Sequence, residues 1–330
     1  MDNNLREKYF KQLEIELKEL IDPNTNLLSE KYSKIINCPL CGSSSKSQEQ
    51  LFIKNGYTFV RCNHCEMIFT NPQVNQDLLG ELYGESKAND IWVELQKSEK
   101  EKKWKKDYYT NSLDLICKFI TKEKIRLLDI GCSTGYFLDI VSKNKPLWHL
   151  KGIELSENAY HEALSKGYTI EKKFINELGE EERFDIFSMF GVLEHIPTPN
   201  TILEDIKAHC NKNESSLVIA VVPNAYSLYH MFLQKNSLSF DGRNHLLYFS
   251  EKTLRRLFEQ NDFKVLSIDT VLTGLNNIKN QIQWLDPYTN SNTDTYMPSS
   301  LKNLFDSGII EDYIYKHNLG LRLRIVAEYS

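Results

Sequence analysis

Residues 125–156 constrain the fold of this 330-residue chain more than any other stretch. Residues 125–130 form a short apolar run with Asp129 near its end, which is typical of a strand buried on both faces of a parallel sheet. The small residues 131–135 follow, then apolar residues at helical spacing, and then a second apolar run at 150–155. The pattern predicts a strand, a tight turn, a helix and a second, parallel strand.

Each of these strands carries an acidic residue near its end, and the turn between them contains two glycines. Small residues let a ligand approach the backbone, and the first turn of a helix offers free N–H groups. Ligands of open α/β sheets bind outside the carboxyl ends of the strands, so we expect Glu154 and the glycine turn to face one crevice. A carboxylate there can accept hydrogen bonds from both hydroxyls of a ribose. The pattern therefore predicts a cofactor that contains a nucleoside.

What the turn lacks narrows the choice of cofactor. It has no third glycine at the spacing of the dinucleotide fingerprint and no lysine of a phosphate-binding loop. The run DIGCSTG at residues 129–135 resembles the first motif, D-x-G-x-G/S-x-G, of the class I S-adenosylmethionine (SAM) methyltransferases. The same residues also contain G-x-S-x-G, the nucleophile elbow of hydrolases. An elbow, however, explains neither Asp129 nor an acid at the end of the next strand.

The resemblance to class I methyltransferases implies which residues surround the SAM cofactor. Gly131, Ser133 and Gly135 would meet its methionine end and ribose, Glu154 would bind the ribose diol, and Asp129 would order the turn through hydrogen bonds. The remaining predicted cofactor contacts follow later strands and comprise Leu155, Phe174 and Ile175 around the adenine, and Phe190 near the methionine part.

Strands and helices continue to alternate beyond Glu154. Apolar runs predict strands at 168–174, 184–190, 217–222, 263–271 and 321–329, the last of them antiparallel and at the edge of the sheet. We therefore expect an α/β fold with a Rossmann-like, doubly wound sheet of seven strands whose last strand is antiparallel. An insertion at about 275–319 is too long for a hairpin, and the sequence leaves open whether it covers the substrate or contacts a second subunit.

Two C-x2-C pairs precede this domain and are separated by twenty residues, just beyond the usual spacing of four-cysteine zinc sites. The four residues are Cys38, Cys41, Cys62 and Cys65. Two such pairs can place four thiolates tetrahedrally around one zinc ion, and a complete ligand set indicates a structural role. The alternating residues between them predict a hairpin that turns at residues 55–56, so residues 37–75 are interpreted as a zinc ribbon.

The other segments complete the predicted domain organisation. Residues 1–36 contain an amphipathic N-terminal helix, and residues 76–122 form a polar helical connector or lid. Residues 123–330 are the predicted SAM-dependent methyltransferase domain with its insertion.

Two further motifs indicate a small acceptor. The run EHIPTP at 194–199 resembles the E-H-x-x-x-P sequence of methyltransferases that act on small molecules. The run FDGRNHLLYFS at 240–250 resembles the F-D-x-x-x-H-E-H-x-x-Y-F-S segment of zinc-ribbon sugar C-methyltransferases, which act on deoxysugars attached to a nucleotide. The run here is two residues shorter, and Asn244 stands where that family has a glutamate before the histidine.

Methyl transfer to a hydroxyl or an activated carbon needs a group that accepts the acceptor's proton, and histidine can do so at neutral pH. The second resemblance makes His245 the first candidate for this base, and His195 is the second. Spacing alone does not decide between a catalytic and a structural role for His245. Tyr83, Tyr136 and Arg243 are the candidates for the acceptor pocket.

Composition limits the partners and the location. A net charge of −5 and a pI near 6.0 give no general attraction to nucleic acid or to anionic membranes. No apolar run approaches a membrane span, the N-terminus is charged rather than a signal peptide, and seven cysteines suit a reducing compartment. We expect a cytoplasmic enzyme, with a homodimer as the assembly to test.

The sequence thus predicts a zinc-ribbon, SAM-dependent methyltransferase of a small polar acceptor. A sugar, a nucleotide sugar or a glycan precursor fits best, which implies carbohydrate biosynthesis. Two alternatives stay open: a zinc-ribbon rRNA or tRNA base methyltransferase, and a non-catalytic zinc-ribbon interaction protein.

Overall fold

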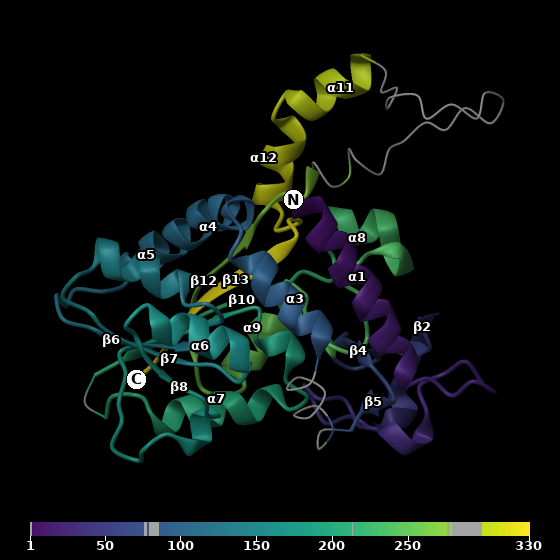
Figure 1. Ribbon diagram of the computed structural model, residues 1–330, viewed down its shortest axis with the longest axis horizontal. Helices are drawn as coiled ribbons and strands as arrows, with labels where there is room; N and C mark the ends of the chain where they lie inside the picture. Colours follow the sequence, from purple (N-terminus) through teal and green to yellow (C-terminus); the bar gives the residue numbers. More distant parts are fainter. Residues whose placement is uncertain (1, 76–77, 79–85, 213, 276–277, 279–298) are drawn as a thin grey trace.

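The computed structural model describes residues 2–75, 78, 86–212, 214–275, 278 and 299–330. The strands of its main sheet are β6 (Arg126–Ile130), β7 (His149–Ile153), β8 (Thr169–Glu171), β9 (Ile186–Phe190), β10 (Ser216–Pro223), β12 (Lys264–Val271) and β13 (Arg322–Tyr329). They lie in the order β12-β13-β10-β9-β6-β7-β8 (Figure 1). Only β13 is antiparallel to its neighbours. The predicted seven-stranded α/β sheet with an antiparallel last strand is confirmed.

The position of β13 differs from the prediction. It lies between β10 and β12, and β12 is the edge strand, so the prediction that β13 forms the edge was wrong. Residues 323–327 of β13 are all buried, whereas most of β12 is half-buried. A strand covered on both faces belongs in the interior of a sheet. Both segments are apolar, and the strand order depends on pairing between distant parts of the chain.

Helices cover both faces of this sheet. The helices described are α1 (Asp2–Glu19), α3 (Lys87–Gln96), α4 (Glu99–Cys117), α5 (Tyr136–Asn144), α6 (Glu157–Ser165), α7 (Pro199–Ala208), α8 (Leu228–Leu233), α9 (Glu251–Glu259), α11 (Ser299–Asp306) and α12 (Ile309–Lys316). One apolar cluster joins Leu127 and Ile186 of the sheet to α4 and α5, and another joins Leu128 and Phe187 to α7 and α9. Successive residues of each strand therefore face opposite layers. None of the helices described is long and apolar enough to cross a bilayer.

A second, four-stranded sheet has the order β11-β4-β3-β2 and contains β2 (Gln48–Lys54), β3 (Tyr57–Cys62), β4 (Ile68–Thr70) and β11 (Leu247–Tyr248). The predicted hairpin between β2 and β3 is confirmed, and Asn55 and Gly56 both have positive φ, 53° and 83°. Two such residues are typical of the turn that suits twisted strands. Nearby, β1 (Ser33–Lys34) pairs with β5 (Gln73–Val74).

The strand β11 connects this N-terminal region to the later part of the chain. Leu247 pairs with Phe69 and Tyr248 with Ile68, so the segment predicted to carry the base is anchored to the N-terminal sheet. Leu247 and Tyr248 belong to an apolar cluster that also contains Phe59 of β3 and residues of the main sheet. The predicted insertion at about 275–319 contains α11 and α12. The helix α11 projects away from the main sheet (Figure 1). Residues 279–298 of the insertion lie outside the described residues.

Candidate functional site

The turn after β6 folds over the carboxyl ends of β6 and β7. The N–H groups of Gly131 and Cys132 both donate to the carbonyl oxygen of Ile153, at 2.8 and 3.1 Å. Gly131 has a φ of +67°, and a Cβ there would lie 2.8 Å from Cγ2 of Val192. Both the backbone conformation and the space therefore require glycine at this position. Gly135, with a φ of +73°, precedes the first residue of α5.

Glu154 contacts this turn directly. Its Oε2 accepts the N–H of Ser133 and its Oε1 accepts the N–H of Ser156, both at 2.8 Å. Burial raises the pKa of the Glu154 carboxyl, and the backbone N–H groups act in the opposite direction. An ionised carboxylate has about four acceptor positions, so each oxygen can accept a further donor such as a ribose hydroxyl. The structure thus brings the predicted ribose acid and the predicted turn together.

Asp129 lies beneath the turn and is buried. Its Oδ1 accepts the hydroxyl of Ser188 on β9 at 2.6 Å, and the two residues are paired across the sheet. Burial raises the pKa of Asp129 to about 7; the Ser188 hydrogen bond lowers it and nearby Glu154 raises it. The carboxyl therefore ties β6 to β9 where both strands reach the crevice.

The other predicted cofactor contacts differ in exposure. Leu155, next to Glu154, and Phe174, after β8, are 42% and 57% exposed, so each offers an apolar surface to a planar ligand. Ile175 is buried at 4%. The ring of Phe190 packs among aromatic residues of α4 and α5, with centroid distances of 4.9 Å to Tyr109 and 4.6 Å to Phe137.

Of the predicted acceptor residues, Tyr136 begins α5 and its hydroxyl donates to the carbonyl of Lys102 at 3.0 Å. This bond ties the first half of α4 to the end of the glycine turn. Tyr83 lies outside the described residues.

His195 and His245 lie side by side although they are far apart in the sequence, with ring centroids 4.9 Å apart. Nδ1 of His195 meets the carbonyl oxygen of Asn244 at 2.7 Å, and Nδ1 of His245 meets that of Ser239 at 2.9 Å. A carbonyl oxygen only accepts, so each Nδ1 carries the hydrogen and the lone pair of each neutral ring is on Nε2. One nitrogen of each ring and one carboxylate oxygen of Glu194 lie within 4.8 Å of one another.

The surroundings of His195 favour its neutral imidazole. Burial lowers the pKa of His195, with Glu194 as the main opposing influence and His245 acting in the same direction as burial. The neighbouring Glu194 is itself 1% exposed, and its Oε2 has no hydrogen-bond partner among the described residues. The cluster therefore combines basic nitrogens with a carboxylate oxygen whose acceptor capacity is not used.

The backbone around His245 is held by side chains of its own segment. Oδ1 of Asp241 accepts the N–H groups of residues 243–245 at 3.0, 2.8 and 3.2 Å. The hydroxyl of Tyr248 donates to the carbonyl of His245 at 2.7 Å. These contacts hold the backbone of His245, and the bond from Nδ1 to Ser239 orients its ring.

Arg243 connects the same segment to the N-terminal helix. It is 4% exposed, and its Nη1 lies 2.5 Å from Oε2 of Glu16 on α1. Glu16 also accepts the hydroxyl of Ser86 at 2.7 Å and the N–H of Ala88 at 2.8 Å. The ion pair therefore joins α1, the start of α3 and the segment that carries His245.

Two residues in this region were missed by sequence reasoning, namely His230 and Arg322. His230 on α8 is 4% exposed; its Nδ1 meets the carbonyl of Asn224 at 2.5 Å, and its Nε2 has no hydrogen-bond partner among the residues described. Burial lowers its pKa to about 4, and His245 and Arg322 also lower it. A lone histidine on a short helix and an arginine at the start of a strand belong to no motif, so no sequence signal could have identified either residue.

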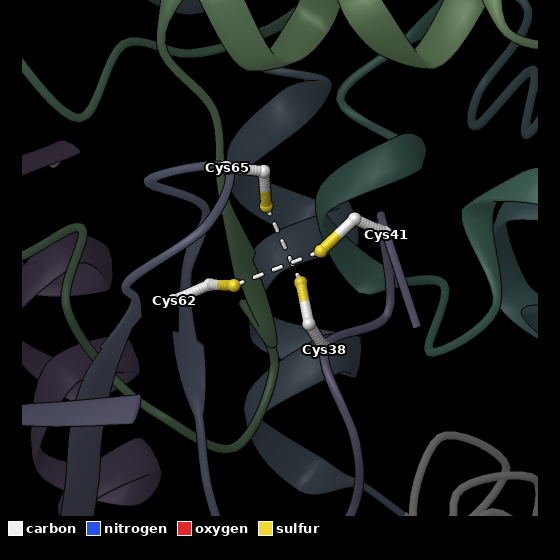
Figure 2. A group of neighbouring side chains, drawn as sticks. All are labelled: Cys38, Cys41, Cys62 and Cys65. Carbon is white, nitrogen blue, oxygen red and sulfur yellow. Dashed lines mark hydrogen bonds between the residues drawn. The ribbon is translucent and has the colours of Figure 1, made fainter. Parts of the chain in front are cut away.

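The four cysteines form a separate site in the N-terminal sheet. Figure 2 shows their sulfur atoms pointing toward one centre, with Sγ of Cys38 and Cys65 3.4 Å apart and Sγ of Cys41 and Cys62 3.7 Å apart. Zinc bound tetrahedrally by thiolates at about 2.3 Å requires sulfur atoms about 3.8 Å apart. The cluster is therefore compatible with a small zinc ribbon, and no disulfide links the cysteines of the chain.

Known proteins resemble this chain in sequence and fold. The model of a family described as a methyltransferase domain matches residues 103–268. The structure of the plantazolicin methyltransferase BpumL in complex with SAH is 16% identical, with a TM-score of 0.50, covering 76% of this chain and 94% of that one. The magnesium protoporphyrin IX methyltransferase of Synechocystis PCC 6803 with bound SAH gives a TM-score of 0.49 at 12% identity, covering 78% and 100%.

A relative by sequence is the mitochondrial ubiquinone biosynthesis O-methyltransferase of Candida albicans, which is 31% identical over 97 residues. That match covers 26% of this chain and 29% of the relative, so it spans less than a third of either protein.

Proposed function

Because this chain belongs to the methyltransferase domain family and is a SAM-dependent methyltransferase, we propose that its acceptor is a small polar molecule: a sugar, a nucleotide-linked sugar or a glycan precursor. The observation that carries this proposal is the pair formed by His195 and His245, whose Nε2 lone pairs lie in the region where β9 reaches the crevice. His245 also belongs to the segment that resembles the sugar C-methyltransferases.

Different residues of the crevice would bind the cofactor, place the acceptor and remove its proton. The bound SAM would supply a methyl group on a sulfonium, and the turn at 131–135 together with Glu154 would hold its methionine end and ribose. Leu155 and Phe174 would cover the adenine. The chain must then place the acceptor in line with the methyl group and remove the acceptor's proton. We assign proton removal to Nε2 of His245, with His195 beside it, and Tyr136 to the rim of the acceptor pocket.

We further propose a structural zinc ion at the four cysteines, held by thiolates from two knuckles. The geometry supports it because the sulfur–sulfur distances are close to those of a tetrahedral site. A cytoplasmic location and a homodimer stay predictions.

A second candidate acceptor is RNA. A hollow of about 560 Å³ between α4, α5 and α6 is lined by six lysines and three acidic residues. The lysines are Lys97, Lys102, Lys103, Lys106, Lys143 and Lys166. Three of these have a carboxylate within ion-pair distance, which leaves a modest basic surface. RNA binding that weakens steeply with salt would favour this candidate.

Calorimetric titration with S-adenosylhomocysteine (SAH) tests the cofactor site. We expect the Glu154→Gln variant to bind SAH roughly 10- to 150-fold more weakly than the native protein, because hydrogen bonds to a charged group contribute about 1.5–3 kcal/mol. Glu181→Gln, which changes an exposed carboxylate on the loop before β9, is the matched control. Equal SAH affinity in both variants would contradict the assignment of Glu154.

A further inference from the structure

Arg322 reaches the crevice from the main sheet. It is the first residue of β13 and pairs with Pro223, the last residue of β10. Its Nη1 lies 3.6 Å from the point that a Cβ of Gly191 would occupy, so the guanidinium extends to the loop after β9. Within the described part of the chain, no carboxylate lies within ion-pair distance of this partly buried group.

Arg324 provides a comparison on the same face of the same strand. It is 7% exposed, its Nε and Nη2 donate to Asp269 at 2.9 and 2.5 Å, and its Nη1 donates to Ser112 at 3.2 Å. Removing a charged group from water without a partner is unfavourable. The fold gives each guanidinium nitrogen of Arg324 a partner, whereas Arg322 reaches the loop after β9 without an ion pair among the described residues, which indicates that a ligand completes its coordination.

The surroundings of Arg322 are also short of negative charge. Lys105 of α4 donates to the neutral amide of Gln96. Burial lowers the pKa of the Lys105 ammonium to about 8; the charge of Glu101 raises this pKa, and the charge of Arg322 lowers it. The Nε2 of His230 is buried without a partner among the described residues. A carboxylate oxygen, Oε1 of Glu194, lies 3.5 Å from the same Cβ point at Gly191, but Glu194 forms no ion pair with Arg322.

We propose that Arg322, supported by Lys105 and His230, binds an oxyanion of the acceptor, a carboxylate or a phosphate. The planar guanidinium presents paired N–H donors that match two oxygens of either group. The inference rests on the proposed function, because it specifies the charge of the acceptor at that same site. An oxyanion held here leaves the rest of the acceptor to extend from Gly191 toward His195 and His245. Oε1 of Glu194 lies 3.5 Å from the Cβ point at Gly191, and a carboxylate oxygen of Glu194 lies within 4.8 Å of both imidazoles.

The test is calorimetric titration of the zinc-loaded protein with inorganic phosphate, pyrophosphate and acetate, each with and without saturating SAH. We expect Arg322→Gln to weaken oxyanion binding roughly 10- to 150-fold and to leave SAH affinity unchanged, because only the acceptor's charge-assisted hydrogen bonds are lost. Arg322→Lys keeps the positive charge but loses the paired N–H donors of the guanidinium, so we expect an intermediate oxyanion affinity. This variant also tests the proposal if the Gln variant fails to fold. Stronger binding of phosphate or of acetate identifies the source of the oxyanion.

Lys143→Gln is the matched control, because Lys143 lines the lysine-rich hollow and has no ion pair in the part of the chain described. Loss of phosphate binding in this variant but not in Arg322→Gln would overturn the proposal, as would a native protein that binds none of the three anions. Weaker SAH binding in Arg322→Gln would also overturn it, because Arg322 would then hold the carboxylate of the cofactor. A native protein that binds oxyanions through Arg322 but binds no SAH would contradict the proposed function alone.

Discussion

Replacement of His245 by Asn is expected to slow methyl transfer by a factor of about 10²–10⁴ while SAH affinity stays unchanged. Asn has no basic nitrogen, so it cannot accept the proton of the acceptor, and general-base catalysis contributes a factor of this size. Its amide can still donate to the carbonyl of Ser239, which His245 now contacts through Nδ1 at 2.9 Å. The local structure should therefore persist. The measurement is the rate of SAH formation with a saturating acceptor, together with SAH affinity by calorimetry.

His161→Asn is the matched control, because His161 is exposed on α6. We expect native turnover in this variant. Native turnover in His245→Asn as well would remove His245 from the mechanism, and a similar loss in His195→Asn alone would assign proton removal to His195.

Replacement of Cys62 by Ser is expected to release the zinc and to loosen the N-terminal sheet. Zinc binding contributes about 10–16 kcal/mol to folding in isolated zinc-finger peptides, so loss of one thiolate should lower occupancy severely. Because β11 pairs with β4, loosening should extend to the segment that carries His245 and reduce turnover. The turn at Gly131, held by bonds to β7, should stay formed.

Metal analysis and hydrogen exchange would measure these effects. In Cys62→Ser we expect faster exchange at 38–70 and 240–250, and native protection at 126–156. Cys117→Ser, which changes a half-buried thiol on α4, should retain one zinc per chain. Full zinc occupancy in Cys62→Ser would contradict the four-cysteine site.

The parts of the fold that the sequence predicted are those determined by local pattern. The strand, turn and helix of residues 126–144 follow from an apolar run, two glycines and helical spacing within one short stretch. The four cysteines are likewise brought together by a hairpin whose turn residues are adjacent in the sequence. Spacing and turn chemistry were sufficient in both places.

The parts that the sequence could not predict depend on contacts between distant segments. The pairing of β11 with β4 joins residues 247–248 to 68–69, and the interior position of β13 depends on which strands it meets. The same holds for the crevice. His230 and Arg322 belong to no motif. Only the folded chain shows that, among the residues it describes, Nε2 of His230 is buried without a hydrogen-bond partner and the guanidinium of Arg322 has no carboxylate at ion-pair distance.

The ion pair between Arg243 and Glu16 gives Arg243 a structural role that the sequence did not predict. The sequence analysis named Arg243 among the candidates for the acceptor pocket. In the structure its guanidinium is buried against α1, so its contribution to the site includes holding the segment of His245 in place. No periodicity or motif could have linked two residues that are 227 positions apart in the sequence.

The most direct test of the central claim is to incubate the zinc-loaded protein with SAM and a panel of nucleotide sugars, and to analyse the products by mass spectrometry. We expect a nucleotide sugar heavier by one methylene group and an equal amount of SAH, with both products strongly reduced in His245→Asn. Binding of SAH without methylation of any nucleotide sugar, combined with methyl transfer to an RNA hairpin, would contradict the proposed acceptor.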